Sequence, residues 1–229
     1  MSEQVRDMFS DISAEYDLLN DVLSFGRHRC WKNKFVKNIK LPNDGKHLDV
    51  ATGTGDIAEL VVKKYGMKTE IIGVDFSESM IIKARFRKNS KYVNLDFQTG
   101  DATDLKYPDN YFDSVSISFG IRNIPSLVKA IEEMGRVIKP GGLLAIMEFG
   151  TPSQPFNIIY KFYSKYLIPN IGKIMTGNDF AYKYLPETIK KFPYGEEFKK
   201  IVISTNIFSD IKVSKMDFGA VFAYYCTKK

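Results

Sequence analysis

Through the middle of the chain, segments with the apolar pattern of a strand alternate with segments with the apolar spacing of a helix. Short apolar runs of strand length are separated by longer stretches in which apolar residues recur at helical spacing. The pattern predicts strands at residues 47–52, 70–75, 93–98, 111–119 and 142–149, and helices at 55–66, 78–88 and 125–138. Such alternation is typical of an α/β fold in which helices cover both faces of a doubly wound, mostly parallel sheet.

The two ends of the chain follow other patterns. Apolar residues recur at helical spacing over residues 3–40, which predicts a helical cap before the first strand. Residues 211–226 alternate partly and turn at 217–219, which predicts an antiparallel hairpin that completes a seven-stranded sheet. Residues 151–195 combine a linker with an aromatic amphipathic stretch, which predicts a helical lid over a substrate. We therefore expect one domain over 1–229, with a cap at 1–45, a core at 46–150, a lid at 151–200 and the hairpin at 201–229.

A glycine-rich turn joins the first predicted strand to the first predicted helix of the core. Gly53 and Gly55 let the backbone turn sharply and approach a ligand without a side chain in the way, and the helix start offers free N–H groups. Asp75 ends the next strand about twenty residues later, where a carboxylate can bind ribose hydroxyls. The turn therefore predicts a nucleotide-like ligand, and the spacing Gly53-x-Gly55-x-x-Ala58 leaves NAD open.

Acidic residues around this turn favour a cationic ligand. Asp49 lies in the strand before the glycines and Asp56 follows them. Two carboxylates would repel a pyrophosphate but attract the sulfonium of S-adenosylmethionine. At a third strand end, the Asp101 side chain can accept a hydrogen bond from an adenine amino group, while the N–H of Ala102 donates one to the ring.

Other candidate site residues fall at or just past predicted strand ends. Thr54 lies between the two glycines, and Ser118 lies near the end of the fourth strand, where ligands of doubly wound folds bind. Arg122 follows that strand directly. An arginine there costs desolvation unless it has a partner, which favours a functional role.

Four short motifs together resemble the motif series of class I S-adenosylmethionine-dependent methyltransferases. They occupy residues 49–56, 73–80, 100–102 and 136–142, in the order and spacing of that class. The resemblance implies cofactor-binding roles for Gly53, Thr54, Gly55, Asp75, Asp101, Ala102 and Ser118.

Further segments resemble, more narrowly, the C-methyltransferases of menaquinone and ubiquinone biosynthesis. These segments are 16–20, 24–32, 116–123, 184–189 and 192–193, and the similarity runs from about residue 5 to the end of the chain. The resemblance implies C-methylation of a lipophilic polyprenyl quinol, first demethylmenaquinol, with a methoxy polyprenyl benzoquinol of ubiquinone biosynthesis as the alternative. The residues alone leave two other classes open: an NAD-dependent oxidoreductase and a non-catalytic sensor of an adenosyl ligand.

Carbon methylation needs an electron-rich ring, and loss of a quinol hydroxyl proton supplies it. Because the aspartates are assigned to the cofactor, we expect Arg122, with Asn123 orienting, to stabilise the developing quinolate. His28 and Tyr16 are the reserve candidates. His28 lies between two arginines, whose like charge disfavours its protonated form, and Tyr16 lies in a polar segment that can cover the cofactor.

Composition and charge add bounds to this picture. The 229 residues are 44% hydrophobic and 26% charged, which is ordinary for a globular domain, and no apolar run is long enough to span a bilayer. Cys30 and Cys226 lie near opposite ends and give neither a disulfide framework nor a metal cluster, so we expect no metal and a cytoplasmic protein.

The net charge of +6 can reflect a nucleic-acid partner, an anionic membrane surface or merely a lysine-rich proteome. No RNA-binding signature or long Lys/Arg block points to a nucleic acid. Because a polyprenyl substrate resides in the membrane, we expect transient contact with anionic lipid and no nucleic-acid partner. The sequence leaves the oligomeric state open.

Overall fold

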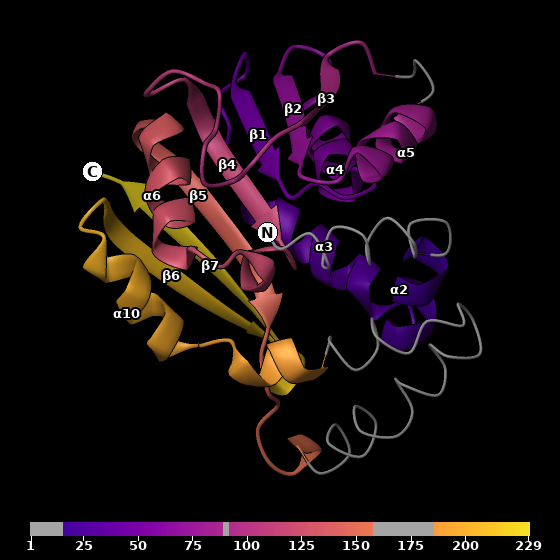
Figure 1. Ribbon diagram of the computed structural model, residues 1–229, viewed down its shortest axis with the longest axis vertical. Helices are drawn as coiled ribbons and strands as arrows, with labels where there is room; N and C mark the ends of the chain where they lie inside the picture. The colour runs from indigo at the N-terminus through magenta and orange to yellow at the C-terminus, as the bar shows by residue number, and fades with distance from the viewer. Residues whose placement is uncertain (1–15, 89–91, 158–185) are drawn as a thin grey trace.

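The structure is a computed structural model that describes residues 16–88, 92–157 and 186–229 (Figure 1). Its strands are β1 (Lys46–Val50), β2 (Glu70–Asp75), β3 (Leu95–Thr99), β4 (Phe112–Ser118), β5 (Ile138–Phe149), β6 (Phe208–Met216) and β7 (Val221–Lys228). Its helices are α2 (Tyr16–Ser24), α3 (Arg27–Asn38), α4 (Asp56–Tyr65), α5 (Glu78–Lys88), α6 (Leu127–Val137) and α10 (Glu196–Ser204), with short 3-10 turns η1 (Ile121–Asn123) and η3 (Asp217–Gly219).

The described strands form one seven-stranded sheet in the order β3-β2-β1-β4-β5-β7-β6. Strands β1 to β5 pair in parallel, whereas β7 lies antiparallel between β5 and β6. The predicted doubly wound, mostly parallel sheet with an antiparallel carboxyl-terminal hairpin is therefore confirmed. Most of the predicted lid lies outside the described residues, and so does the part of the predicted cap before residue 16.

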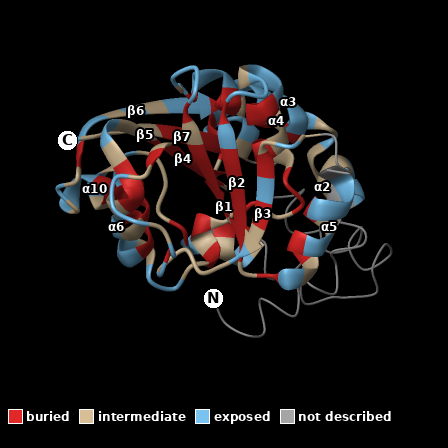
Figure 2. Ribbon diagram, turned by 90° about the horizontal axis from the view of Figure 1, so that it is seen from above, coloured by how far each residue is buried: buried red, intermediate tan, exposed pale blue. Residues whose placement is uncertain are grey.

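Each face of the sheet is covered by its own set of helices, as Figures 1 and 2 show. One apolar core contains Leu48 and Val50 of β1 together with buried residues of α6 and α10. The other contains buried residues of α3, α4 and α5 packed on the opposite face. Because successive strand residues point to opposite faces, His47 and Asp49 lie on the face opposite to Leu48 and Val50.

Strand β5 begins earlier than predicted. Ile138 pairs with Phe112, but the next pair is Leu143 with Ser114, so the chain leaves the ladder between these two pairs. Pro140, Gly141 and Gly142 lie between these two pairs and form a bulge. It lies at the amino end of the strand, away from the carboxyl ends where ligands bind. In the described part of the chain, no helix has both the length and the apolar character to cross a membrane.

One aromatic ring packs against two glycines at the carboxyl edge of the sheet. A Cβ at Gly73 on β2 would lie 2.5 Å from Cδ1 of Phe97 and 2.8 Å from Oγ1 of Thr52. A Cβ at Gly55 would lie 2.5 Å from Cζ of the same ring. Phe97 itself is fully buried on β3. The ring therefore joins β3 to the start of α4 through space that only glycine leaves free.

Gly73→Ala should destabilise the protein by about 1–3 kcal/mol, because the added methyl overpacks a rigid contact with the Phe97 ring. Adding Phe97→Leu should relieve the clash, so the double variant should lose less stability than the two single variants together. Urea denaturation of all three variants measures this coupling. Additive losses would show that Gly73 and Phe97 do not constrain one another.

Candidate active site

An open cleft lies at the carboxyl ends of the parallel strands, where the strand order reverses between β1 and β4. Its volume is about 710 Å³, including the open mouth. Ligands of doubly wound sheets bind at such a reversal. Its described lining includes residues that end or follow four strands: β1 (Ala51, Gly53), β2 (Asp75, Phe76), β3 (Asp101, Ala102) and β4 (Ser118, Phe119). The charged residues among those described at the lining are acidic, so the cleft attracts cations.

The loop at residues 51–55 is held in shape by its own hydrogen bonds. Ala51, Gly53 and Gly55 have φ angles of 51°, 56° and 88°, so the backbone enters the left-handed region three times. The N–H of Gly53 donates to Oδ2 of Asp75 at 2.8 Å. The N–H of Gly55 donates to the carbonyl of Thr52 at 2.9 Å. Both glycine N–H groups therefore serve the protein itself and are not left for an anionic ligand.

Asp75 joins this loop to the end of β2. While Oδ2 accepts from Gly53, Oδ1 accepts the N–H of Ser77 at 2.9 Å. Burial raises the pKa of Asp75, and the two backbone donors oppose that rise. Each carboxylate oxygen keeps a lone pair that can accept from a ligand hydroxyl. Asp75 therefore fixes the loop and also presents acceptors to the cleft.

A buried chain of hydrogen bonds lies behind the loop. Asp49 accepts hydroxyl hydrogen bonds from Thr52 and Ser116, each at 2.6 Å. His47 extends the chain, with Nε2 3.0 Å from Oγ of Ser116 and Nδ1 2.6 Å from Oγ of Ser114. Because Ser116 gives its only hydrogen to Asp49, Nε2 of His47 must carry the hydrogen that Ser116 accepts, and Ser114 then donates to Nδ1. This neutral tautomer satisfies both ring nitrogens.

Burial shifts the pKa values of Asp49 and His47, the two titratable groups in this set of hydrogen bonds, away from their ordinary ranges. It raises the pKa of Asp49 to about 6, against the hydrogen bonds from Ser116, Thr52 and the Ala58 backbone. It lowers the pKa of His47 to about 3, so this imidazole is neutral at physiological pH. Asp49 is 1% exposed and does not belong to the described lining of the cleft. It therefore acts on a ligand through its charge and through the loop that it holds.

Asp101 presents a second carboxylate to the cleft. Its Oδ1 accepts hydrogen bonds from the N–H and the hydroxyl of Thr103, both at 2.8 Å. Burial alone would raise its pKa, but the Thr103 bonds outweigh burial and hold the pKa below its ordinary value. Asp101 is therefore ionised at neutral pH, next to the cleft residue Ala102.

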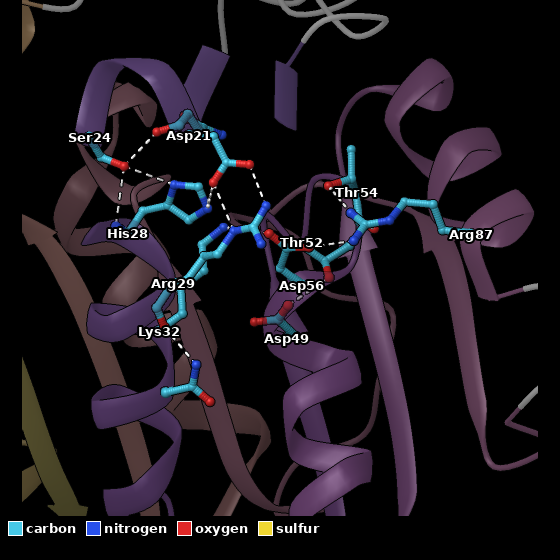
Figure 3. Close-up of polar contacts among 12 residues, drawn as sticks. Asp21, Ser24, His28, Arg29, Lys32, Asp49, Thr52, Thr54, Asp56 and Arg87 are labelled. Atoms are coloured by element: carbon cyan, nitrogen blue, oxygen red, sulfur yellow. Dashed lines mark hydrogen bonds and ion pairs between the residues drawn. The ribbon is translucent and has the colours of Figure 1, made fainter. Parts of the chain in front are cut away.

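Ion pairs fasten the cap to the glycine loop (Figure 3). Asp56, the first residue of α4, pairs with Lys32 of α3 at 2.6 Å and with Arg87 of α5 at 2.8 Å. Arg87 also donates to the hydroxyl of Thr54 at 2.7 Å. Burial alone would raise the pKa of Asp56, but the two cations hold it at about 2. Helices α3, α4 and α5 thus meet at the start of α4. The hydroxyl of Thr54 is bound by Arg87 there.

Arg122, in the turn η1 after β4, is paired with a buried carboxylate. Its Nη1 donates to Oε1 of Glu148 at 2.8 Å and to the carbonyl of Phe119. The two side chains of the ion pair are 7% and 1% exposed. Burial raises the pKa of Glu148, although the charge of Arg122 opposes the rise. Nε of Arg122 is buried and has no hydrogen-bond partner among the described residues. Asn123 lines the cleft.

His28 lies at the junction of α2 and α3, where Figure 3 shows it beside Ser24 and Asp21. Its Nδ1 is 3.0 Å from Oγ of Ser24, and its Nε2 is 3.6 Å from Oδ1 of Asp21. Burial is the main cause that lowers the pKa of His28, and Lys32 contributes the like charge. The expected disfavouring of the protonated form is therefore confirmed, but burial is its main cause and Lys32, not an adjacent arginine, supplies the like charge. The side chain of Tyr16, the other reserve candidate, lies outside the described structure.

The structure places five predicted cofactor-binding residues on the cleft, and two beside it. Those on the cleft are Gly53, Asp75, Asp101, Ala102 and Ser118. Thr54 and Gly55 do not belong to its described lining, because Thr54 faces Arg87 and Gly55 lies against Phe97. Their contact with a cofactor stays a prediction.

Sequence reasoning missed two partners of charged residues. Glu148 lies in the apolar run 143–149, and a single acidic residue in such a run signals a buried cation nearby. Lys32 lies in the cap, 24 residues before its partner Asp56, and no local signal connects the two.

Comparisons with known proteins identify the family of the chain. The model of the ubiE/COQ5 methyltransferase family matches residues 1–228. A protein of Bacteroides fragilis named demethylmenaquinone methyltransferase is 40% identical over 230 residues, which cover 99% of this chain and 93% of the relative. A protein of Geobacter sulfurreducens named ubiquinone/menaquinone biosynthesis C-methyltransferase UbiE is 42% identical over 225 residues, which cover 97% and 87%.

A solved structure supports the fold. The crystal structure of a SAM-dependent methyltransferase from Aquifex aeolicus aligns with a TM-score of 0.61 and 22% identity, over 86% of this chain and 89% of that one. With the family match over nearly the whole chain, the conclusion is direct: this chain belongs to the ubiE/COQ5 methyltransferase family.

Proposed function

We propose that this protein transfers the methyl group of S-adenosylmethionine to a ring carbon of a polyprenyl quinol, with demethylmenaquinol as the substrate. Family membership supports methyl transfer. The name of the Bacteroides fragilis relative supports demethylmenaquinol. The observation that carries the choice of cofactor is the hydrogen bond from Gly53 N–H to the carboxylate of Asp75.

This hydrogen bond disfavours the NAD reading of the glycine turn. A dinucleotide site binds pyrophosphate at the N–H groups of this loop and of the following helix. Here Gly53 donates to Asp75, and Gly55 donates to Thr52. Asp101, a second carboxylate at the cleft, adds a negative charge that would repel a pyrophosphate.

The same residues suit S-adenosylmethionine. Asp75 can accept from ribose hydroxyls, and Asp101 can accept from the adenine amino group while Ala102 N–H donates to the ring. Phe76 and Met80 line the cleft and give a flat heterocycle an apolar surface. When bound, S-adenosylmethionine supplies an electrophilic methyl group on a positively charged sulfur. The acidic cleft and the charge of Asp49 behind the loop are complementary to that charge.

Arg122 is the group that we assign to the quinol oxygen. Its Nη1 is committed to Glu148, which fixes the guanidinium next to the residues that line the cleft. Its buried Nε–H has no partner in the described part of the chain, and such a donor is costly unless a ligand accepts from it. Donation to a developing quinolate would lower the pKa of the quinol hydroxyl, and Asn123 on the cleft would orient the ring.

The polyprenyl tail implies that the substrate comes from a lipid bilayer. The net charge of +6 supports a transient, peripheral contact of the protein with an anionic membrane. Such contact would let the ring reach the cleft while the tail stays in lipid.

Turnover with a short-tailed demethylmenaquinol and S-adenosylmethionine, followed by mass spectrometry, tests the proposal. We expect a product that is heavier by one methyl group in place of a ring hydrogen. A benzoquinol assayed in parallel tests the alternative substrate. Binding of S-adenosylmethionine without any methylated quinol would contradict the proposal and favour the sensor.

Asp75→Ala should weaken S-adenosylmethionine binding at least tenfold, because charge-assisted hydrogen bonds contribute about 1.5–3 kcal/mol each. Asp75→Asn keeps one acceptor oxygen and should lose less. Asp210→Ala is the matched control, since this aspartate is exposed on the edge strand β6. Calorimetric titration of variants with native circular dichroism measures the affinities. Unchanged affinity in folded Asp75→Ala would remove Asp75 from the site.

Affinity for S-adenosylmethionine should increase as pH rises through the pKa of Asp49, which burial places at about 6. Below this pKa Asp49 is protonated, and above it the carboxylate attracts a sulfonium. A cationic ligand stabilises the ionised form, so linkage requires tighter binding on the alkaline side. Among the described groups, Asp75 is the charged neighbour, and its charge raises the pKa of Asp49, whereas His47 stays neutral. Titrations between about pH 5 and about pH 8 measure the midpoint.

Ser116→Ala should move this midpoint upward by about one pH unit, because it removes one hydrogen bond to the Asp49 carboxylate. Ser114→Ala is the matched control, since Ser114 contacts His47 and not Asp49. The assignment fails if both variants move the midpoint equally or if neither moves it.

Variants of the Arg122–Glu148 pair separate a catalytic role from a structural one. Glu148→Gln keeps the guanidinium, so turnover should stay within a few-fold. Adding Arg122→Met removes the cation without leaving a buried unpaired charge, and turnover should then fall by about 10²-fold, with affinity for S-adenosylmethionine nearly unchanged. Equal turnover in the single and double variants would mean that Arg122 only neutralises Glu148.

A further inference from the structure

Three exposed aromatic side chains lie at the edge of the sheet where the parallel strands end. Phe25 between α2 and α3 is 78% exposed, Phe218 in η3 is 58% exposed, and Phe156 after β5 is 39% exposed. We call these three residues the aromatic ridge. Exposed apolar surface of this kind on a soluble domain marks an interaction site when it is contiguous.

Contacts between distant parts of the chain make the ridge contiguous. The rings of Phe156 and Phe218 are stacked, with centroids 3.8 Å apart. Arg27, two residues after Phe25, donates through Nε and Nη2 to both carboxylate oxygens of Asp217, the neighbour of Phe218. The turn that carries Phe218 is therefore tied to the start of α3, next to Phe25.

The ridge is connected to the cleft through Trp31. The indole Nε1 of Trp31 donates to Oδ2 of Asp217 at 2.7 Å. The same indole lies against Phe119, with ring centroids 6.4 Å apart, and Phe119 lines the cleft. A surface that binds at the ridge would therefore face the part of the molecule where the cleft opens.

The backbone of the ridge is held in an unfavourable conformation. Phe25, Asp217 and Phe218 have φ angles of 49°, 46° and 58°, a region that bulky side chains rarely adopt. The carbonyl of Phe218 accepts the N–H of Ser153 at 2.9 Å, which helps to hold its turn. Strained residues persist where the surroundings impose them, and such sites are often functional. Here two of the three strained residues, Phe25 and Phe218, carry exposed aromatic rings.

The charges around the ridge are mainly positive. Arg27, Arg29, Lys34 and Lys215 are exposed. Two described carboxylates near them, Asp217 and Asp21, are paired by Arg27 and Arg29. Lys34 acts on Asp217 through its charge, and Cδ of Lys215 lies near Gly219 in the same turn. Aromatic rings with a cationic rim complement the interface of an anionic bilayer, where rings enter the headgroup boundary and cations meet the phosphates.

We propose that the aromatic ridge docks on an anionic lipid bilayer and turns the opening of the cleft toward the membrane. This inference rests on the proposed function, because a polyprenyl quinol must be taken from lipid. Docking by this surface lets the quinol ring enter the protein while its tail stays among the acyl chains.

Vesicle sedimentation of the full chain tests the ridge. Phe25→Asn with Phe218→Asn removes both strained rings, and Asn tolerates a positive φ, so the fold should persist. Phe86→Asn is the matched control, because Phe86 is 84% exposed on α5 and lies outside the ridge. The probes are vesicles of phosphatidylcholine alone and of phosphatidylcholine with phosphatidylglycerol in equal parts, at low and high salt.

We expect the wild type and Phe86→Asn to bind the anionic vesicles, with weaker binding at high salt. The double ridge variant should bind at least tenfold more weakly, because two large apolar side chains no longer leave water. Its turnover of a short-tailed quinol in solution should match the wild type, while turnover of a long-tailed quinol in vesicles should fall. If the wild type never methylates a quinol, the proposed substrate is wrong. Sedimentation would still show whether the aromatic ridge binds the membrane.

The proposal is overturned if the wild type binds no vesicles, if the double variant binds as well as the wild type, or if Phe86→Asn loses as much. Analytical ultracentrifugation without lipid tests a second copy of the chain as the occupant. A shift from dimer to monomer in the double variant, with vesicle binding unchanged, would assign the ridge to that contact and refute the membrane.

Discussion

The site depends on one carboxylate that holds a loop of the backbone. Asp75 accepts the N–H of Gly53 and the N–H of Ser77, and so joins the loop after β1 to the end of β2. The loop can meet this carboxylate because its backbone passes through the left-handed region, which glycine adopts at little cost. The hydrogen bond between Gly53 and Asp75 also favours a cationic ligand over an anionic one, because it uses a backbone N–H that other doubly wound proteins offer to phosphate. The cleft instead presents carboxylate acceptors, and it suits a cationic adenosyl ligand.

Helix α3 connects this loop to the outer surface of the protein. Its Lys32 binds Asp56 at the start of α4, and Asp56 also binds Arg87, which holds Thr54 of the loop. One residue earlier, Trp31 binds Asp217 in the turn of the hairpin. The loop, the cap and the aromatic ridge are thus fixed by one helix. The proposed uptake of a quinol from a membrane, with water excluded during the reaction, would benefit from such a link between surface and site.

The strands and helices could be predicted from the sequence, because they follow from the spacing of apolar residues. The partners of individual polar side chains could not, because they come from distant parts of the chain. The strands and helices of the core follow from apolar period, so their predicted positions agree with the structure to within a few residues; β5 differs because Ile138 pairs with Phe112 before the bulge. Arg122 was expected to need a partner, and Glu148 stands out as an acidic residue in an apolar run, but the two lie 26 residues apart and only the fold shows that they pair. Thr54 follows a strand end as a ligand residue would, yet Arg87, 33 residues later, binds its hydroxyl. Residue types show which groups need partners, and only the fold shows which partners they find.

Calorimetric titration of the same preparation with S-adenosylmethionine and with NAD decides whether the loop selects a cationic adenosyl ligand, because the two ligands share an adenosyl group and differ in charge at the loop. We expect saturable binding of S-adenosylmethionine and no binding of NAD at the same concentrations, since the glycine N–H groups are already used and the cleft is acidic. Binding of NAD at least as tight as that of S-adenosylmethionine would contradict this expectation.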